Sequence, residues 1–177
     1  MHLELKPESI LEEIQDKVVT QQLSFDRIWK DISKELKKEN IILVDDRKLN
    51  VTQQKFVIQY FNEEVRSYIV PLMIESIQGF PVLNDKSIYL ACKLSKSDRS
   101  IPQKFALVSV PTRSLPRFVI LPSKINEHAI ILLEDIIRFC LPNIFSFFGY
   151  DRFAAHTIKL TRDAEIDIDN DLSTSLI

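Results

Sequence analysis

A change of hydrophobic period near Pro71 constrains the fold of this chain more than any other feature of its sequence. From Ser9 to about Lys38, apolar residues recur at alternating spacings of three and four, which predicts a helix with one apolar stripe. A shorter helix is predicted over about 52–67. Over 88–94 the period is two, the pattern of a half-buried strand. We therefore expect an α+β fold, with a helical N-terminal segment followed by a mixed-sheet α+β domain.

The apolar stripe of the first predicted helix is too long for the second helix to cover. Its positions are Leu11, Ile14, Val18, Gln21, Phe25, Ile28 and Ile32. Helices in proteins gain most of their stability by packing such a face against other elements. We therefore expect a partial helix bundle, completed by helices that precede Met1 or by another subunit.

Short apolar runs predict the remaining elements. Phe105–Val110 and Phe118–Leu121 are nearly continuous apolar runs close to prolines, as expected for central strands covered on both faces. Three further patterns predict a short strand over 130–132, a helix over 133–141 that Pro142 ends, and a strand that begins within 157–161. Together these elements predict a mixed sheet with helices packed on it.

Glycine is scarce in this chain, and its scarcity excludes two kinds of phosphate site. Only Gly79 and Gly149 occur, whereas glycine makes up about 7% of an average protein. A loop that cradles phosphate needs several glycines, because backbone N–H groups must converge on the anion. The sequence therefore excludes a Walker-type loop and a dinucleotide-binding fingerprint.

The two cysteines and the N-terminus indicate a reducing compartment. Cys92 and Cys140 lie far apart in the sequence among apolar neighbours, which favours buried free thiols over a disulfide or a metal site. The first residues include acids where a signal peptide is basic, and no apolar stretch approaches about 18 residues. We expect a cytoplasmic protein without a transmembrane segment.

Positive charge gathers in the stretch 93–124, although the net charge of the chain is −2. Seven cations accompany a single acid, Asp98, so the local charge is seven minus one, or +6. The cations are Lys93, Lys96, Arg99, Lys104, Arg113, Arg117 and Lys124. Such a surface attracts a polyanion by Coulomb forces, which salt screens over about 8 Å. The alternative is a solvated face, because proximity in sequence does not show that side chains converge.

None of the three histidines has the sequence setting of a catalytic group. A phosphohistidine needs a group that orients the ring and cations that hold the phosphoryl group. His156 shares a predicted strand face with Ile158 and Leu160, so we expect it in the core or in an interface. His128 is expected in a turn, and His2 at a frayed end. We expect no catalytic, cofactor-binding or metal-binding residue in this chain.

Acidic residues alternate near the C-terminus, at Asp163, Glu165, Asp167, Asp169 and Asp171. A calcium loop needs glycine at its sixth position, where the sequence has Ile168 or Leu172, depending on the residue from which the loop is counted. Magnesium-binding carboxylates remain one interpretation of this segment. A solvated strand edge that leads into a helix N-cap is the other.

Two arginines and one aromatic cluster have both a functional and a structural interpretation. Arg117 and Arg162 could each grip a phosphate, because a guanidinium binds two anionic oxygens at once, or each could form an ion pair. The aromatic cluster could stack on bases, or it could form the core or a subunit interface. Its members are Phe145, Phe147, Phe148, Tyr150 and Phe153.

Six ordered blocks resemble the long bacterial polyphosphate kinases, which polymerise phosphate from ATP through a phosphohistidine. Three blocks resemble the middle domain of that family: FPVLNDKSIYLACKL (80–94), FALVSVPTRSLPRFVILP (105–122) and IKLTRDAEIDIDND (158–171). Three upstream blocks resemble the end of its helical N-terminal domain and the junction: VVTQQLSFDRIW (18–29), ENIILVDD (39–46) and QKFVIQYFNEEV (54–65). The resemblance implies that residues 1–70 end the N-terminal domain and that 71–177 form much of the middle domain.

The resemblance also implies what this part of such an enzyme does. In that family the phosphorylated histidine and the contacts to magnesium and ATP lie mainly in later domains, so we expect a structural piece that is inactive alone. The family's middle domain makes dimer contacts, which implies a homo-oligomer with polyphosphate and ATP as substrates of the whole enzyme and no nucleic acid partner. The alternative is a stand-alone noncatalytic module that binds a polyanion or a full-length kinase.

Overall fold

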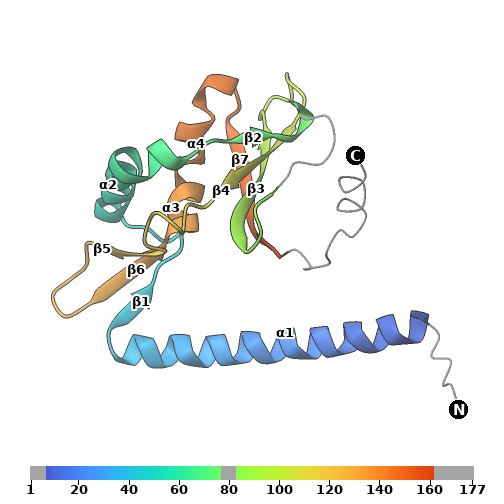
Figure 1. Cartoon of the computed structure of the whole chain (residues 1–177). Helices are drawn as coiled ribbons and strands as arrows, with labels where there is room; N and C mark the ends of the chain where they lie inside the picture. Colours follow the sequence, from blue (N-terminus) through green and yellow to red (C-terminus); the bar gives the residue numbers. More distant parts are fainter. Residues whose placement is uncertain (1–6, 77–82, 162–177) are drawn as a thin grey trace, which may run out of the picture. The chain divides into compact units, whose positions relative to one another are not determined.

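The computed structural model describes residues 7–76 and 83–161 (Figure 1). The chain divides into two compact units. The first contains Met1–Val44 and Ile120–Ile130, and the second contains Asp45–Val119 and Ile131–Ile177. The predicted boundary between residues 70 and 71 concerns the domains of the family and stays a prediction.

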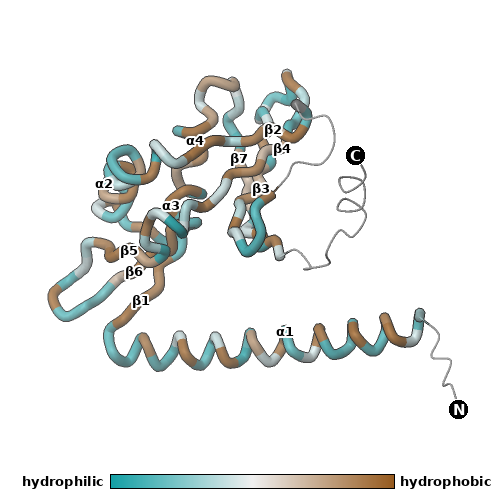
Figure 2. The backbone as a smooth tube through the Cα atoms, in the orientation of Figure 1, coloured by the Kyte–Doolittle hydropathy of each residue, from teal (hydrophilic) through white to brown (hydrophobic). Residues whose placement is uncertain are grey.

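Helix α1 (Pro7–Lys38) dominates the first unit and confirms the long helix predicted from the period of 3.6. Glu8 in its first turn and Lys37 and Lys38 in its last turn complement the helix dipole. Apolar and polar positions alternate along it in Figure 2, yet none of its residues is buried. Within the part of the chain that the structure describes, the apolar stripe of α1 is therefore not covered.

A three-stranded sheet has the order β1-β6-β5. Strand β1 (Ile41–Leu43), which the sequence did not predict, pairs in parallel with β6 (His128–Leu132). Strand β6 confirms the short strand predicted over 130–132. Strand β5 (Phe118–Leu121) was predicted to be central, and this prediction is wrong, because β5 is an edge strand.

The apolar run of β5 misled the prediction because only one of its faces is buried. Val119 and Leu121 are buried, whereas Phe118 is 60% exposed and Ile120 is 72% exposed. Because apolar residues lie on both faces of this strand, hydrophobicity alone does not show which face is buried.

Helix α2 (Val51–Tyr60) opens the helical part of the second unit and confirms the second predicted helix. A capping box begins it: Gln53 donates its backbone N–H to Asn50 Oδ1, and Gln53 Oε1 accepts the N–H of Asn50. The chain continues through a π-helical turn (Phe61–Val65) and a 3₁₀ turn (Arg66–Tyr68). Val57, Phe61 and Val65 are buried along one side of this segment, which contacts α3.

A four-stranded antiparallel sheet forms the rest of the second unit, with the order β2-β4-β3-β7. Its strands are β2 (Leu72–Met73), β3 (Ser87–Ser95), β4 (Lys104–Ser109) and β7 (Arg152–Leu160), and a 3₁₀ turn (Ile74–Ser76) follows β2. Strand β4 is central as predicted, and its consecutive residues 106–108 are all buried. The strand predicted to begin within 157–161 is β7, which begins earlier, at Arg152, and ends at Leu160.

Helix α3 (Leu133–Phe139) confirms the helix predicted over 133–141, but Pro142 does not end it. Cys140 separates α3 from α4 (Leu141–Ile144), where Pro142 lies in the first turn, a position that needs no backbone N–H. A 3₁₀ turn (Ser146–Phe148) and Gly149 then lead into β7. The α+β fold is confirmed, with two sheets.

Candidate functional site

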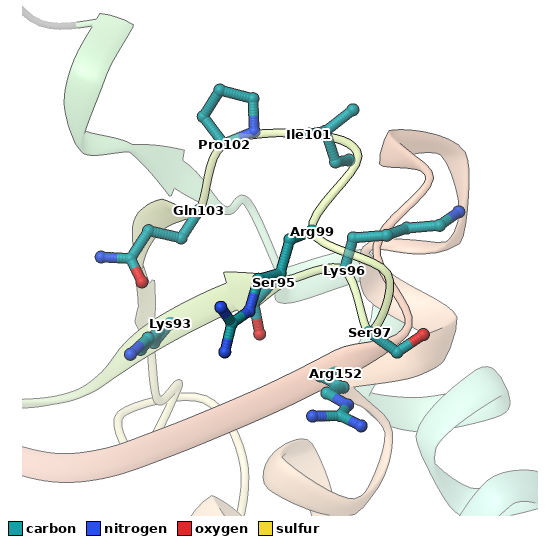
Figure 3. Close-up of a pocket in the computed structure, with 9 residues that line it drawn as sticks. All are labelled: Lys93, Ser95, Lys96, Ser97, Arg99, Ile101, Pro102, Gln103 and Arg152. Atoms are coloured by element: carbon teal, nitrogen blue, oxygen red, sulfur yellow. The ribbon is translucent and has the colours of Figure 1, made fainter.

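A basic pocket of about 490 Å³ lies where the β3–β4 loop meets the start of β7 (Figure 3). Its lining is mainly cationic and polar, and no carboxylate is among the described residues that line it. The lining residues are Lys93, Ser95, Lys96, Ser97, Arg99, Ile101, Pro102, Gln103 and Arg152. We refer to this site as the basic pocket.

Strand pairing brings the two ends of this site together. Ser95 lies directly opposite Arg152, and Lys93 lies opposite Ala154, in the antiparallel pairing of β3 with β7. Opposed residues point to the same face of a sheet, and so do residues two apart, so Lys93 and Arg152 share one face. Figure 3 shows the side chain of Arg99 extending from the loop toward the space between them.

Hydrogen bonds fix the β3–β4 loop to the segment that precedes β7. Asp151 accepts two of them from Ser97, one from its N–H at 2.8 Å and one from its hydroxyl at 2.6 Å. Lys96 Nζ donates to the carbonyl of Gly149 at 2.9 Å, and the Tyr150 hydroxyl donates to the carbonyl of Pro102 at 3.0 Å. The pocket is therefore held in shape before any ligand arrives.

Most of the positive charge in the pocket has no counter-ion. Among residues 7–76 and 83–161, no acidic side chain pairs with Lys93, Arg99 or Arg152. The nearby acids are occupied: Asp98 accepts from the N–H of Ser100, and Asp151 accepts from Ser97. These hydrogen bonds lower the pKa of both carboxyl groups. An anionic ligand would therefore meet three uncompensated cations.

The sequence predicted part of this site. Of the seven cations in 93–124, Lys93, Lys96 and Arg99 line the pocket, and the other four do not. Arg152 was missed, because it lies far along the sequence and joins the site only through the pairing of β7 with β3. Arg152 could have been found only by predicting that β7 pairs with β3 in this register.

Arg117 forms an ion pair, so the structural interpretation of this residue is confirmed. Its Nη2 lies 2.5 Å from Oε1 of Glu134, and its Nε donates to both carboxylate oxygens at 3.2 and 3.3 Å. The contact to Glu134 raises the pKa of the Arg117 guanidinium. Arg162 and the alternating acids of 163–171 lie outside the described residues.

The two described histidines lie on different strands and do not form a reactive site. His156 is exposed on β7 and shares a strand face with Ile158, so the core is excluded for it, and its place in an interface stays a prediction. His128 is exposed and begins β6 instead of occupying a turn. His2 lies outside the described residues. Within the described ranges, no three His, Cys, Asp or Glu side chains are placed to hold a metal ion.

The aromatic cluster divides between the core and the surface. Phe145 is buried, with the ring centroids of Phe148 and Phe153 at 6.0 and 6.4 Å. Phe147 is 90% exposed, and Tyr150 helps to fix the loop of the basic pocket. The cluster therefore provides core packing through Phe145 and two exposed apolar side chains, Phe147 and, at 46% exposure, Phe148.

Both cysteines are buried free thiols, as predicted. Burial raises the pKa of Cys92 and of Cys140 to about 12. In the described part of the chain, no helix is both long and apolar enough to cross a membrane.

The sequence model of the polyphosphate kinase middle domain matches residues 52–177. This chain belongs to the polyphosphate kinase family. The resemblance of the six sequence blocks is thereby confirmed for the middle domain. A polyphosphate kinase of Vibrio parahaemolyticus is 37% identical over 172 residues, which are 95% of this chain and 24% of the relative. A polyphosphate kinase of Escherichia coli K12 is 34% identical over the same share of this chain and 25% of its own length.

A solved structure supports the same assignment. The crystal structure of the polyphosphate kinase from Porphyromonas gingivalis matches with a TM-score of 0.77 and 29% sequence identity. The match covers 89% of this chain and 24% of that one. This chain therefore spans about a quarter of the length of the polyphosphate kinases that it matches.

Proposed function

We propose that this chain is part of an enzyme that reversibly transfers the terminal phosphate of ATP to polyphosphate through a phosphohistidine. In this proposal the histidine and the sites for ATP and magnesium belong to other parts of the enzyme. The contribution of this chain is structural and electrostatic: it makes dimer contacts and offers a basic surface to the polymer.

The convergence of Lys93, Lys96, Arg99 and Arg152 on one pocket without a lining carboxylate is the observation that carries this proposal. Polyphosphate is a flexible polyanion, which Coulomb attraction draws to such a site. Lysine binds phosphate as a point charge, and arginine can bind two of its oxygens at once. Relatives named polyphosphate kinase support the choice of this polyanion over others.

The exposed Phe147 supports the proposed dimer. An apolar side chain with 90% exposure at the tip of a short turn has the character of an interface anchor. The mass of the chain in solution tests this point: we expect a dimer that Phe147→Ser weakens. A monomer at every concentration would remove the dimer from the proposal.

The buried free cysteines fit the cytoplasmic location that we propose, because thiols stay reduced there. ATP and magnesium are proposed as cofactors of the whole enzyme and not as ligands of this chain alone.

Two measurements test the proposed function. Incubated alone with ATP and magnesium, the chain should make no polyphosphate. In a filter-binding titration it should retain polyphosphate, and much less of it at about 200 mM salt than at about 50 mM. Metal-dependent synthesis by the chain alone would contradict the division of labour, and salt-independent binding would contradict the electrostatic role.

A stand-alone polyanion-binding module is the second candidate. It is favoured by one observation: every residue that lines the basic pocket belongs to the same compact unit. The two candidates differ in one outcome, since only the first requires polyphosphate synthesis by a longer polypeptide that contains this chain.

A further inference from the structure

We propose that the basic pocket is a holding site for internal units of a linear polyphosphate chain. In the complete enzyme it would retain the growing polymer between rounds of transfer and so set the length of the product. This inference rests on the proposed function for the identity of the polymer.

The composition of the pocket favours a phosphate chain over a nucleotide. Each internal unit of polyphosphate carries one negative charge, and the pocket offers four cations. A nucleotide or a nucleic acid also needs a surface on which its bases stack, usually aromatic. Ile101 and Pro102 are the only apolar residues among those that line the pocket, and none of its lining residues is aromatic.

The backbone of Arg99 indicates that the pocket is built around this cation. Its φ is +57°, in the left-handed region that glycine and asparagine occupy at much lower cost. Its N–H donates to the carbonyl of Lys96 at 3.1 Å, which closes the turn. A residue that stays in a costly conformation at a binding site is a candidate for function, and here that conformation directs the guanidinium into the pocket (Figure 3).

The pocket has the means to hold a phosphate chain but not to react with it. A nucleophilic hydroxyl needs an adjacent base. The hydroxyl of Ser97 donates to Asp151, but the pKa of that carboxyl is lowered, so it is a weak base. Within residues 7–76 and 83–161, no histidine, cysteine or carboxylate lines the pocket. Binding without chemistry is therefore the role that these residues support.

A holding site changes product length through effective concentration. A polymer tethered at a second site stays near the reaction centre after each transfer, so it rebinds before it diffuses away. Loss of the tether should release shorter chains.

The chain offers unusually well-matched controls for this inference. Lys86 is also an exposed cation in the left-handed region, with φ +55°, and it does not line the pocket. Lys159 is an exposed cation on β7, on the sheet face opposite to that of Arg152. The test therefore compares Arg99→Gly with Lys86→Gly, and Arg152→Ala with Lys159→Ala.

The first experiment measures binding of long-chain polyphosphate, tripolyphosphate and ATP to this chain and its variants, with circular dichroism as a check of folding. We expect Arg99→Gly and Arg152→Ala each to weaken binding of the long chain by about tenfold, and the two controls to change it by less than about twofold. Tripolyphosphate and ATP should compete poorly. Equal effects of pocket and control variants, or competition by ATP as strong as that of the long chain, would overturn the holding site.

The second experiment measures product length in the polypeptide that contains this chain and the rest of the enzyme. Arg99→Gly should shorten the polyphosphate products on a gel, and Lys86→Gly should not. Products of unchanged length would overturn the role in holding the polymer. Absence of synthesis by the unsubstituted enzyme would instead contradict the proposed function, whereas the binding result would still decide whether the site exists.

Discussion

Arg117 and Glu134 form a paired contact that joins the residue before β5 to the first turn of α3. Two nitrogens of the guanidinium contact the carboxylate, the shortest distance being 2.5 Å from Nη2 to Oε1. The side chain of Glu134 is only 3% exposed, while that of Arg117 is 43% exposed. The arginine therefore shields a buried charge, and two of its three guanidinium nitrogens are engaged by the carboxylate.

Replacement of Arg117 by methionine should lower the free energy of unfolding by about 2 kcal/mol, because it leaves the Glu134 carboxylate buried without a partner. The double variant Arg117→Met, Glu134→Leu should recover most of this loss, since neither charge then remains. Urea titrations of the single and double variants measure both effects. A double variant as unstable as Arg117→Met would show that the ion pair is not the cause.

The contact between Ser97 and Asp151 predicts a pH dependence of the pocket loop. The hydrogen bonds from Ser97 lower the pKa of Asp151 below 3.8, the ordinary value for aspartate, while the charge of Asp98 opposes the shift. Because the pKa in the folded state is depressed, the contact stabilises the loop above pH 3.8 and is lost as the pH falls through the lower folded value.

The amide resonance of Ser97 reports this titration directly. Its chemical shift should change with a midpoint below pH 3.8, and Asp151→Asn should abolish the change. A midpoint at or above 3.8 would mean that Ser97 does not hold the carboxylate in solution.

Arg99 should show opposite effects on stability and on binding. The left-handed backbone of Arg99 costs on the order of 1 kcal/mol relative to glycine, so Arg99→Gly relieves strain in the folded state. The greater freedom of glycine in the unfolded state offsets part of this stabilisation. Arg99→Gly should therefore leave the melting temperature unchanged or slightly raised while it weakens binding of polyphosphate. A clear fall in the melting temperature would show that the arginine has a structural role instead.

Gly149 also has a left-handed backbone, but here the residue is already glycine, so the test is to add a side chain. Its φ is +73°, and its carbonyl accepts the hydrogen bond from Lys96. Gly149→Ala should destabilise the chain by about 1 kcal/mol through its backbone, since no atom lies within 4 Å of the added Cβ. Thermal unfolding measures this loss, and an unchanged melting temperature would contradict it.

Local patterns in the sequence predicted the elements whose apolar residues recur at a regular spacing or form a run of sufficient length. Helical spacing of apolar residues identified α1 and α2, the period of two identified β3, and a nearly continuous apolar run identified β4. Strand β5 was placed wrongly, since an apolar run does not tell which face of a strand is covered. Strand β1 has three residues, too few for a period to appear.

The sequence pointed to three of the four cations of the basic pocket, because they belong to one basic stretch. The sequence showed that Lys93, Lys96 and Arg99 are close along the chain, but their convergence on one pocket became visible only in the structure. Arg152 reaches them only through the register of β3 with β7. The sequence likewise did not show that Glu134 pairs with Arg117, because these residues meet only when α3 packs beside the residue before β5.

The two thiols should be inert in the folded chain. Burial raises the pKa of Cys92 and of Cys140 to about 12, and the reactive species is the thiolate. At about pH 8 an exposed cysteine is partly ionised, because its pKa is about 8.5, whereas only about one in ten thousand of these thiols is. Labelling with a thiol reagent should therefore proceed at the rate at which the protein opens, and it should become fast for both thiols in urea. Rapid labelling of either cysteine without denaturant would show that its part of the core opens on its own.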